Sequence, residues 1–412
     1  MFKAPLLKRQ NTMSNKRPLN FLCVTTYHKG ADFIKSCKAE GNNVYLLTKK
    51  KLEHEVWPWE AIDDVFYVEN WNQSDVTKGI AYKFRTIKFD RFVALDDFDV
   101  EKVALLREHF RMPGMGRTTS HYFRDKLAMR AKALVEGINV PEFTALFHDA
   151  DINAYVDRID PPWLLKPRLE ASATGIRKVN SKEELWQIID VLKDERDNYL
   201  VEKFAPGDVY HVDSLVVDSK VIFSRASKYL DTPFEVAHGG GVFRSATCKI
   251  GSKIEKALTQ MNIDVMTAFG MQFGASHTEF IASKETGELF FLETSSRVGG
   301  ANLAEMVEFA SGINLWGEWA RIESATLRKE TYTLPEVKNQ HAGIVVSLSK
   351  FEHPDTSSFN DTEIVWRMDK KWHIGMIVVS DSSERVMELL DSYTQRIATD
   401  FHASIPAPDK SL

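Results

Sequence analysis

Hydrophobic and polar positions in the first hundred residues follow the order strand, helix, strand. Apolar runs of strand length lie at 19–25, 43–47 and 92–95, and helical patterns follow the first and third runs. This alternation predicts a small, open, parallel sheet, and such sheets often bind ligands at the ends of their strands. The glycine-rich fingerprint of a dinucleotide site is missing here, so we assign this region a supporting role.

A break at Pro113-Gly114 introduces a different pattern. Polar residues at 118–120 are N-cap candidates for one long amphipathic helix that reaches about Glu136, where Gly137 ends it. The region that follows is rich in short strands. Strands are expected at 163–168, 176–179, 199–204, 209–217, 221–226, 276–282 and 289–294, and helices at 182–192 and 253–269.

These patterns predict an α/β and α+β fold with an N-terminal Rossmann-like βαβ domain and a C-terminal α+β lobe. The polar stretch 326–340 contains Pro335 and is expected to be a linker or surface excursion before a last α+β unit, which ends in a helix at 384–397. The expected divisions are a flexible tail (1–18), an N-terminal α/β domain (19–115), two central subdomains (116–200 and 201–324) and the C-terminal lobe (325–412).

The composition of the chain argues against several classes of protein. The 412 residues are 43% hydrophobic with a formal net charge of -5, which gives no reason to expect nucleic acid or an anionic membrane as a partner. Three cysteines occur without a CxxC pair, which argues against a disulfide framework and a thiolate zinc site. No apolar run approaches the roughly 18 residues of a membrane span. We therefore expect a soluble, cytoplasmic protein.

Two glutamates around the predicted hairpin turn at 284–287 carry the most informative signal. Counting outward from the turn places Glu279 roughly opposite Glu293 on two antiparallel strands, with both side chains on one face. Like charges in this position repel unless a cation lies between them, and ligation by oxygen alone favours Mg²⁺. The alternative is two solvated glutamates on an exposed hairpin.

Glu293, Ser295 and Arg297 alternate with period two and are expected to project to the same side of their strand. A fixed cation at Arg297 can neutralise a γ-phosphoryl group during its transfer. The alternative for Arg297 is an ordinary surface ion pair. Gly299-Gly300 follows and permits a tight backbone entry into the next helix.

A loop of small residues joins the strand that ends at Lys166 to the next strand. Its amides, among them those of Ser172, Thr174 and Gly175, can donate to phosphate oxygens, while Lys166 projects inward as a point charge. The segment does not match the Walker pattern, so a P-loop is excluded. A plain hairpin with a flexible tip is the alternative.

The strand 200–204 and the turn after it suit an adenosine. Backbone groups near Lys203 and Phe204 can read the adenine edge, and Asp208 can accept hydrogen bonds from the ribose hydroxyls. A core strand that leads into a polar turn explains the same residues. This segment alone does not decide between the two.

Together these motifs resemble the ATP-grasp superfamily of carboxylate-amine ligases, and the resemblance extends to the N-terminal βαβ region. It implies that residues 116–200 carry the lid hairpin and 201–324 the metal site. It also implies that ATP phosphates contact Lys126 and Lys166, that Glu202 to Phe204 hold adenine, and that Glu279 and Glu293 bind magnesium. The family usually has Asn where this chain has Ser295, so Ser295 is a weaker metal ligand and the number of ions is one or two.

The motifs His277-Thr278-Glu279-Phe280 and Arg297-Val298-Gly299-Gly300 look most like those of L-amino-acid ligases that make dipeptides. The implied reaction transfers the γ-phosphoryl group of ATP to a small carboxylate substrate, and an amine substrate then attacks the acyl phosphate. We expect Mg²⁺, with Mn²⁺ as a substitute, and we leave a homodimer open. His238, in a loop of three glycines, is a candidate to reach the acyl phosphate, although a loop histidine more often faces solvent.

Other interpretations lack a required part or stay open. A lipase-like oxyanion loop at 238–241 would need a GxSxG elbow, and a zinc deaminase built on His277-x-Glu279 would need a PCxxC partner; neither is present. An ATP-grasp protein that binds nucleotide as a regulator or scaffold stays open, as does another carboxylase or ligase chemistry on the same fold.

Overall fold

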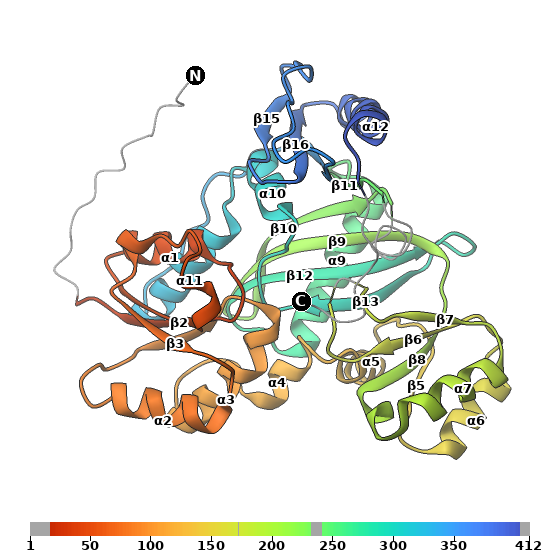
Figure 1. The fold of residues 1–412 in the computed structure, drawn as a ribbon, viewed down its shortest axis with the longest axis horizontal. Coiled ribbons are helices and arrows are strands. Elements are labelled where there is room, and N and C mark those ends of the chain that lie inside the picture. Colours follow the sequence, from red (N-terminus) through yellow and green to blue (C-terminus); the bar gives the residue numbers. More distant parts are fainter. Residues whose placement is uncertain (1–16, 172, 232–240, 404–412) are drawn as a thin grey trace.

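The computed structural model describes residues 17–171, 173–231 and 241–403, and Figure 1 shows the chain arranged around three β-sheets. The N-terminal sheet has four strands, all parallel, in the order β3-β2-β1-β4, which confirms the predicted open parallel sheet. Its elements are β1 (Asn20–Thr25), α1 (Ala31–Ala39), β2 (Asn43–Lys49), β3 (Asp64–Val68), α2 (Gln73–Lys83), β4 (Arg91–Ala94) and α3 (Val100–Phe110).

The second sheet has the strand order β5-β8-β6-β7, and each neighbouring pair is antiparallel. It comprises β5 (Phe143–Ala145), β6 (Trp163–Pro167), β7 (Arg177–Val179) and β8 (Tyr199–Lys203), with α6 (Asp149–Arg158) and α7 (Lys182–Leu192) packed against it. The domain boundary predicted between residues 200 and 201 falls inside β8, which pairs with β5 and β6 and so belongs to this sheet along its whole length.

The single long helix predicted for 118–136 is wrong, since two helices occupy the region, α4 (Arg117–His121) and α5 (Lys126–Val135). Asp125 is the physical reason. Its carboxylate accepts hydrogen bonds from the amides of Leu127 and Ala128 at 2.9 and 3.4 Å, so it caps a new helix. Lys126 thereby becomes the first residue of α5 and lines the site described below.

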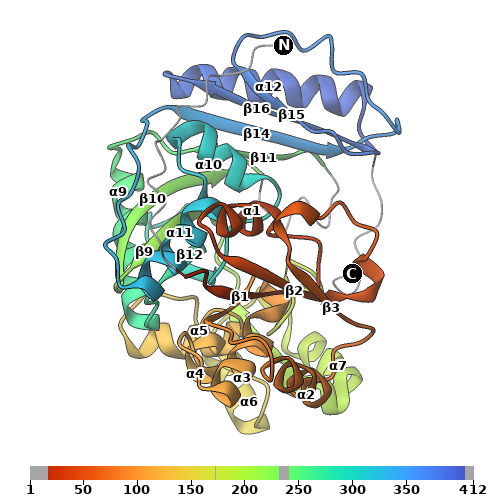
Figure 2. The ribbon, with the colours of Figure 1, turned by 90° about the vertical axis from the view of Figure 1, so that its left-hand side faces the viewer.

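The third sheet has eight strands in the order β13-β12-β9-β10-β11-β14-β16-β15. Its strands are β9 (Gly207–Val217), β10 (Lys220–Tyr229), β11 (Phe243–Thr247), β12 (Gly274–Ser283), β13 (Leu289–Ser295), β14 (His341–Leu348), β15 (Ile364–Arg367) and β16 (His373–Ser380). The helices are α9 (Lys253–Phe269), α10 (Leu303–Ser311), α11 (Leu315–Arg328) and α12 (Ser383–Asp400). Figure 2 shows α12 lying along β14 and β16.

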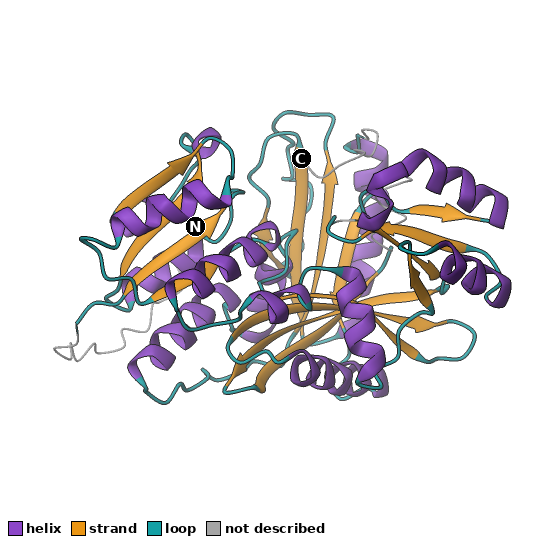
Figure 3. Cartoon of the chain, turned by 90° about the horizontal axis from the view of Figure 1, so that it is seen from below, coloured by secondary structure: helices purple, strands orange, loops and turns teal. Residues whose placement is uncertain are grey.

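The predicted boundary after residue 324 therefore separates strands that belong to one continuous sheet. Alternate residues of β9 explain how this sheet is covered: Val212 and Val216 pack with α9, whereas Leu215 packs with α11 on the opposite face. Figure 3 shows helices on both sides of the long strands. The face toward α10 and α11 also carries the polar residues of the site.

The N-terminal sheet is fixed to the large sheet by a shared core. Phe33 of α1 meets Trp319 of α11 edge to face, with ring centroids 5.0 Å apart, and Leu215 of β9 joins the same cluster. This packing holds the strand ends of the N-terminal sheet against the large sheet. A membrane-spanning helix would need a long apolar segment, and none of the helices in the described part of the chain provides one.

Candidate active site

A cleft of about 940 Å³ lies where the three sheets meet. Its walls come from the ends of β1 and β4, from the loop between β6 and β7, from β8, and from the β12–β13 hairpin. Nine of the residues expected from the sequence line it: Lys126, Lys166, Thr174, Glu202, Phe204, Glu279, Glu293, Ser295 and Arg297. Motifs that are far apart in the sequence therefore share one cavity.

The two glutamates lie as predicted. Glu279 of β12 is the direct antiparallel partner of Glu293 on β13, and an irregularity in the pairing follows immediately after them. The Glu279 side chain is mostly buried and that of Glu293 is half-buried. Burial opposes ionisation of Glu279, but hydrogen bonds from His277 and Tyr229 outweigh it and hold its pKa below the ordinary value. The pair therefore offers two carboxylates side by side.

Lys126 joins this pair to the loop between β6 and β7. Its Nζ lies 2.9 Å from Glu293 Oε2 and donates a hydrogen bond to the Glu170 carbonyl at 2.6 Å. Arg168 anchors the start of the same loop, because it forms an ion pair with Asp125, the cap of α5. One ammonium group thus contacts both a candidate metal ligand and the loop that borders the cleft.

Lys166 forms a buried ion pair with Glu202, and Arg130 of α5 completes the cluster. Arg130 Nε and a terminal nitrogen lie 3.0 and 2.9 Å from Glu202 Oε2. Burial lowers the pKa of Lys166, because it disfavours the charged amine more than Glu202 favours it. The carboxylate of Glu202 is therefore committed to two cations, and it holds Lys166 in place. Arg130 was missed from the sequence.

This cluster gives a stability prediction. Glu202→Gln leaves Lys166 and Arg130 as buried cations without their counterion, so we expect the free energy of unfolding to fall by about 3–5 kcal/mol. Chemical denaturation monitored by circular dichroism measures it. The matched control is Glu142→Gln, which removes an exposed ion pair with Arg158 (3.0 Å) and is expected to change stability little. Equal effects of the two substitutions would contradict the prediction.

Only some of the residues expected to read adenosine lie in the lining of the cleft. The amide of Phe204 donates to the Pro162 carbonyl at 3.0 Å and that of Lys203 to the Glu142 carbonyl at 2.8 Å, so both amides already have partners. The Lys203 side chain turns to the Asp160 carbonyl, outside the cleft lining. Phe204 itself does line the cleft, and its ring lies under the Lys178 ammonium.

Other expected residues lie outside the lining. Asp208 forms an ion pair with Lys228 at 2.6 Å. Gly175, with φ of 71°, is absent from the lining, whereas its neighbour Thr174 lines the cleft together with other residues of the loop between β6 and β7. Ser172 and His238, both expected to act in the site, lie outside the described residues.

The N-terminal domain supplies charged groups that the sequence did not assign to the site. Asp97, in the turn after β4, forms an ion pair with Arg297 at 2.5 Å, and Asp96 does the same with Lys29 at 2.6 Å. Burial opposes ionisation of Asp97, but Arg297 and Arg124 outweigh it and hold its pKa well below the usual range. Tyr27 also lines this wall. These residues follow β1 and β4, and the rule that parallel sheets bind ligands at strand ends could have found them.

The donor set fits magnesium and a nucleoside triphosphate. Two adjacent carboxylates and the Ser295 hydroxyl are hard oxygen donors, and they lie in the same lining as Lys126, Lys166 and Arg297. The cations can neutralise phosphate charge beside a carboxylate-bound ion. The apolar part of the cleft near Phe204 offers a surface for a base.

Comparison with known proteins agrees with this geometry. No protein-family model matches the chain. It is 26% identical over 261 residues to an L-arginine-specific L-amino acid ligase of Bacillus subtilis, a match that covers 62% of each chain. The chain thus spans less than two thirds of the length of the curated relatives that it matches first.

Solved structures resemble nearly the whole chain. The L-amino acid ligase from Bacillus licheniformis superposes with a TM-score of 0.73 at 18% identity, over 94% of this chain and 99% of that one. The biotin carboxylase domain of the Hydrogenobacter thermophilus 2-oxoglutarate carboxylase, solved with MgADP, ADP and bicarbonate, gives 0.69 at 14% identity over 94% and 91%. The protein described here therefore has the fold of these enzymes, the ATP-grasp fold.

Proposed function

We propose that this protein is an ATP-dependent carboxylate-amine ligase that forms an amide bond through an acyl phosphate. One observation carries the proposal: the opposed pair Glu279 and Glu293 shares a single cleft with Lys126, Lys166 and Arg297. Paired carboxylates next to fixed cations suit the transfer of a phosphoryl group, which depends mostly on positioning and charge stabilisation. The sequence similarity to an L-amino acid ligase supports amino acids or related small carboxylates as substrates.

Each residue has a defined task in this proposal. Glu279 and Glu293, with Ser295, would hold one or two Mg²⁺ ions, or Mn²⁺ in their place, and the bound metal neutralises charge on the phosphates. Lys126 and Lys166 orient the phosphates, and Thr174 donates from the loop above them. Arg297, held by Asp97, faces the phosphoryl group that moves.

The chemistry balances in two steps. A carboxylate oxygen of the first substrate attacks the γ-phosphorus, and the bond from that phosphorus to the β-γ bridging oxygen breaks, which releases ADP. The amine nitrogen of the second substrate then attacks the carbonyl carbon, inorganic phosphate leaves, and the nitrogen loses a proton. Exclusion of water from the cleft protects the acyl phosphate from hydrolysis.

We further propose that the protein acts in the cytoplasm and that it forms a homodimer.

An isotope experiment tests the reaction class. With a panel of amino-acid pairs and other small carboxylates, ADP release is expected to require a carboxylate, because that substrate accepts the phosphoryl group. If the carboxylate carries ¹⁸O, one labelled oxygen must appear in the released phosphate, as mass spectrometry can show. Carboxylate-independent turnover, or unlabelled phosphate from an active pair, would contradict the ligase proposal. ATP binding without turnover across the panel would favour a regulatory or scaffold role.

A further inference from the structure

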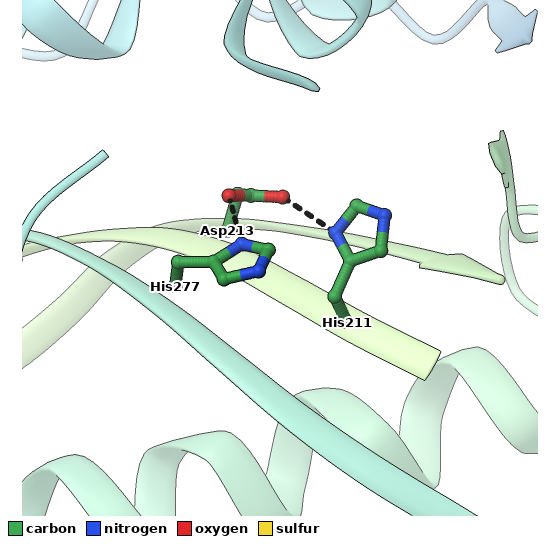
Figure 4. Close-up of side chains that lie close together, drawn as sticks. All are labelled: His211, Asp213 and His277. Atoms are coloured by element: carbon green, nitrogen blue, oxygen red, sulfur yellow. Dashed lines mark hydrogen bonds and ion pairs between the residues drawn. The ribbon is translucent and has the colours of Figure 1, made fainter. Parts of the chain in front are cut away.

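A buried hydrogen-bond network lies behind Glu279. Asp213 of β9 accepts from Nδ1 of His211 and from Nδ1 of His277, both at 2.8 Å, and Figure 4 shows its carboxylate between the two rings. The strand register explains the arrangement, because Asp213 pairs with His277 and His211 pairs with Glu279 across β9 and β12. The network continues from His211 Nε2 to Ser245 Oγ on β11, also at 2.8 Å.

Three such side chains with ligand atoms within 4.8 Å of one another have the composition of a metal site. The distances favour hydrogen bonds instead, since each Nδ1 lies at 2.8 Å from a different oxygen of Asp213. The network is therefore better explained as a hydrogen-bonded support than as a second metal centre.

The network reaches one particular oxygen of Glu279. The Tyr229 hydroxyl donates to Glu279 Oε1 at 2.8 Å, and His277 Nε2 lies 3.6 Å from the same oxygen. The Tyr229 hydroxyl is also 3.3 Å from His277 Nε2, so the three groups touch one another. Oε1 is thus held from behind by the Tyr229 hydroxyl and bordered by the His277 ring, which leaves Oε2 as the oxygen available to a metal.

Gly299 shows how tightly the network is enclosed. A Cβ at this position would lie 2.8 Å from both Asp213 Oδ1 and His277 Nδ1, closer than real contacts allow. A glycine is thus needed here for space. The segment after Arg297 packs directly on the network, which ties the support of Glu279 to the backbone that carries the arginine.

Resting on the function proposed above, we propose that Tyr229 and His277, with Asp213 behind His277, are positioning residues for the metal ligand Glu279. Tyr229 fixes the carboxylate by its hydrogen bond to Oε1, His277 contacts both the Tyr229 hydroxyl and that oxygen, and Asp213 fixes the orientation of the His277 ring. Partners behind a metal ligand orient it and tune its affinity, and losing one typically costs about 10–100-fold in metal binding. The proposed role is one of positioning, because Tyr229 and His277 contact Glu279 and act through it.

The test uses Tyr229→Phe, which removes one hydroxyl and keeps the ring. We expect the Mn²⁺ concentration for half-maximal binding in the presence of ATP, followed by electron paramagnetic resonance, to rise by about tenfold. ATP binding without metal should stay unchanged, and ADP release should recover at saturating Mn²⁺. Tyr393→Phe is the matched control, because it also removes a buried tyrosine hydroxyl bonded to a carboxylate, that of Asp361 at 2.6 Å, outside the cleft.

Two further variants separate positioning from folding. Asp213→Asn should weaken Mn²⁺ binding in the same way, and His277→Gln, which retains an amide donor, should lose less metal affinity than His277→Ala. If Tyr229→Phe binds Mn²⁺ as wild type does, or if Tyr393→Phe loses affinity equally, the positioning role is wrong while the ligase proposal stands. If the wild-type protein binds no Mn²⁺ with ATP, the proposed function itself fails.

Discussion

Glu293→Gln is expected to slow carboxylate-dependent ADP release by at least about 100-fold, because it removes one of the two charges that face each other across β12 and β13. Glutamine keeps the size of the side chain but supplies a neutral oxygen in place of a carboxylate. The substitution also leaves the Lys126 ammonium, 2.9 Å from Glu293 Oε2, without its counterion. Initial rates of ADP release at a series of Mg²⁺ concentrations measure the effect.

The matched control for this prediction is Glu285→Gln. Glu285 lies in the turn of the same hairpin and is exposed, so the same change of charge occurs outside the cleft. We expect Glu285→Gln to retain the wild-type rate. Wild-type activity in Glu293→Gln, or an equal loss in the two variants, would mean that the carboxylate pair does not hold the metal.

Local pattern predicted much of the fold and the centre of the site. The helices Lys182–Leu192 and Lys253–Phe269 begin and end where the periodicity placed them. The opposition of Glu279 and Glu293 was also predictable, because a short hairpin turn fixes the register of both strands. In such cases every interacting residue lies within a few turns or one hairpin of its partner.

Contacts between distant segments escaped prediction for a physical reason. Arg297 meets Asp97 across 200 residues, and Arg130 meets Glu202 across 72, so neither pairing leaves a mark in the local pattern. The motif His277-x-Glu279 was visible, but its partner Asp213 lies on β9, 64 residues earlier. The order of strands in the sheet decides these contacts. The hydrophobic pattern of the sequence does not indicate that β9 lies between β12 and β10.

The pairing of Arg297 with Asp97 explains how a charge in a large cleft is held still. The Arg297 side chain is only 12% exposed, donates to the Val298 carbonyl at 2.7 Å and contacts Asp97 at 2.5 Å. Asp97 belongs to the N-terminal domain, which the shared core around Trp319 fixes to the large sheet. The guanidinium is thus oriented before substrates bind, and preorganised charge of this kind lowers barriers most effectively.

Arg297→Met is therefore expected to lower the rate of ADP release by about a thousandfold, comparable to the loss of an arginine that stabilises phosphoryl transfer. Asp97→Asn should lose less activity, and the double variant should lose no more than Arg297→Met alone, because the aspartate acts through the arginine.

Arg225→Met is the control for this prediction. It removes another buried arginine, bonded to the Lys338 carbonyl at 2.9 Å outside the cleft, and should keep the wild-type rate if folded. Thermal melting identifies any variant that fails to fold. Additive losses in the double variant would show that Asp97 has a role independent of Arg297, and a rate near wild type in Arg297→Met would remove the arginine from the mechanism.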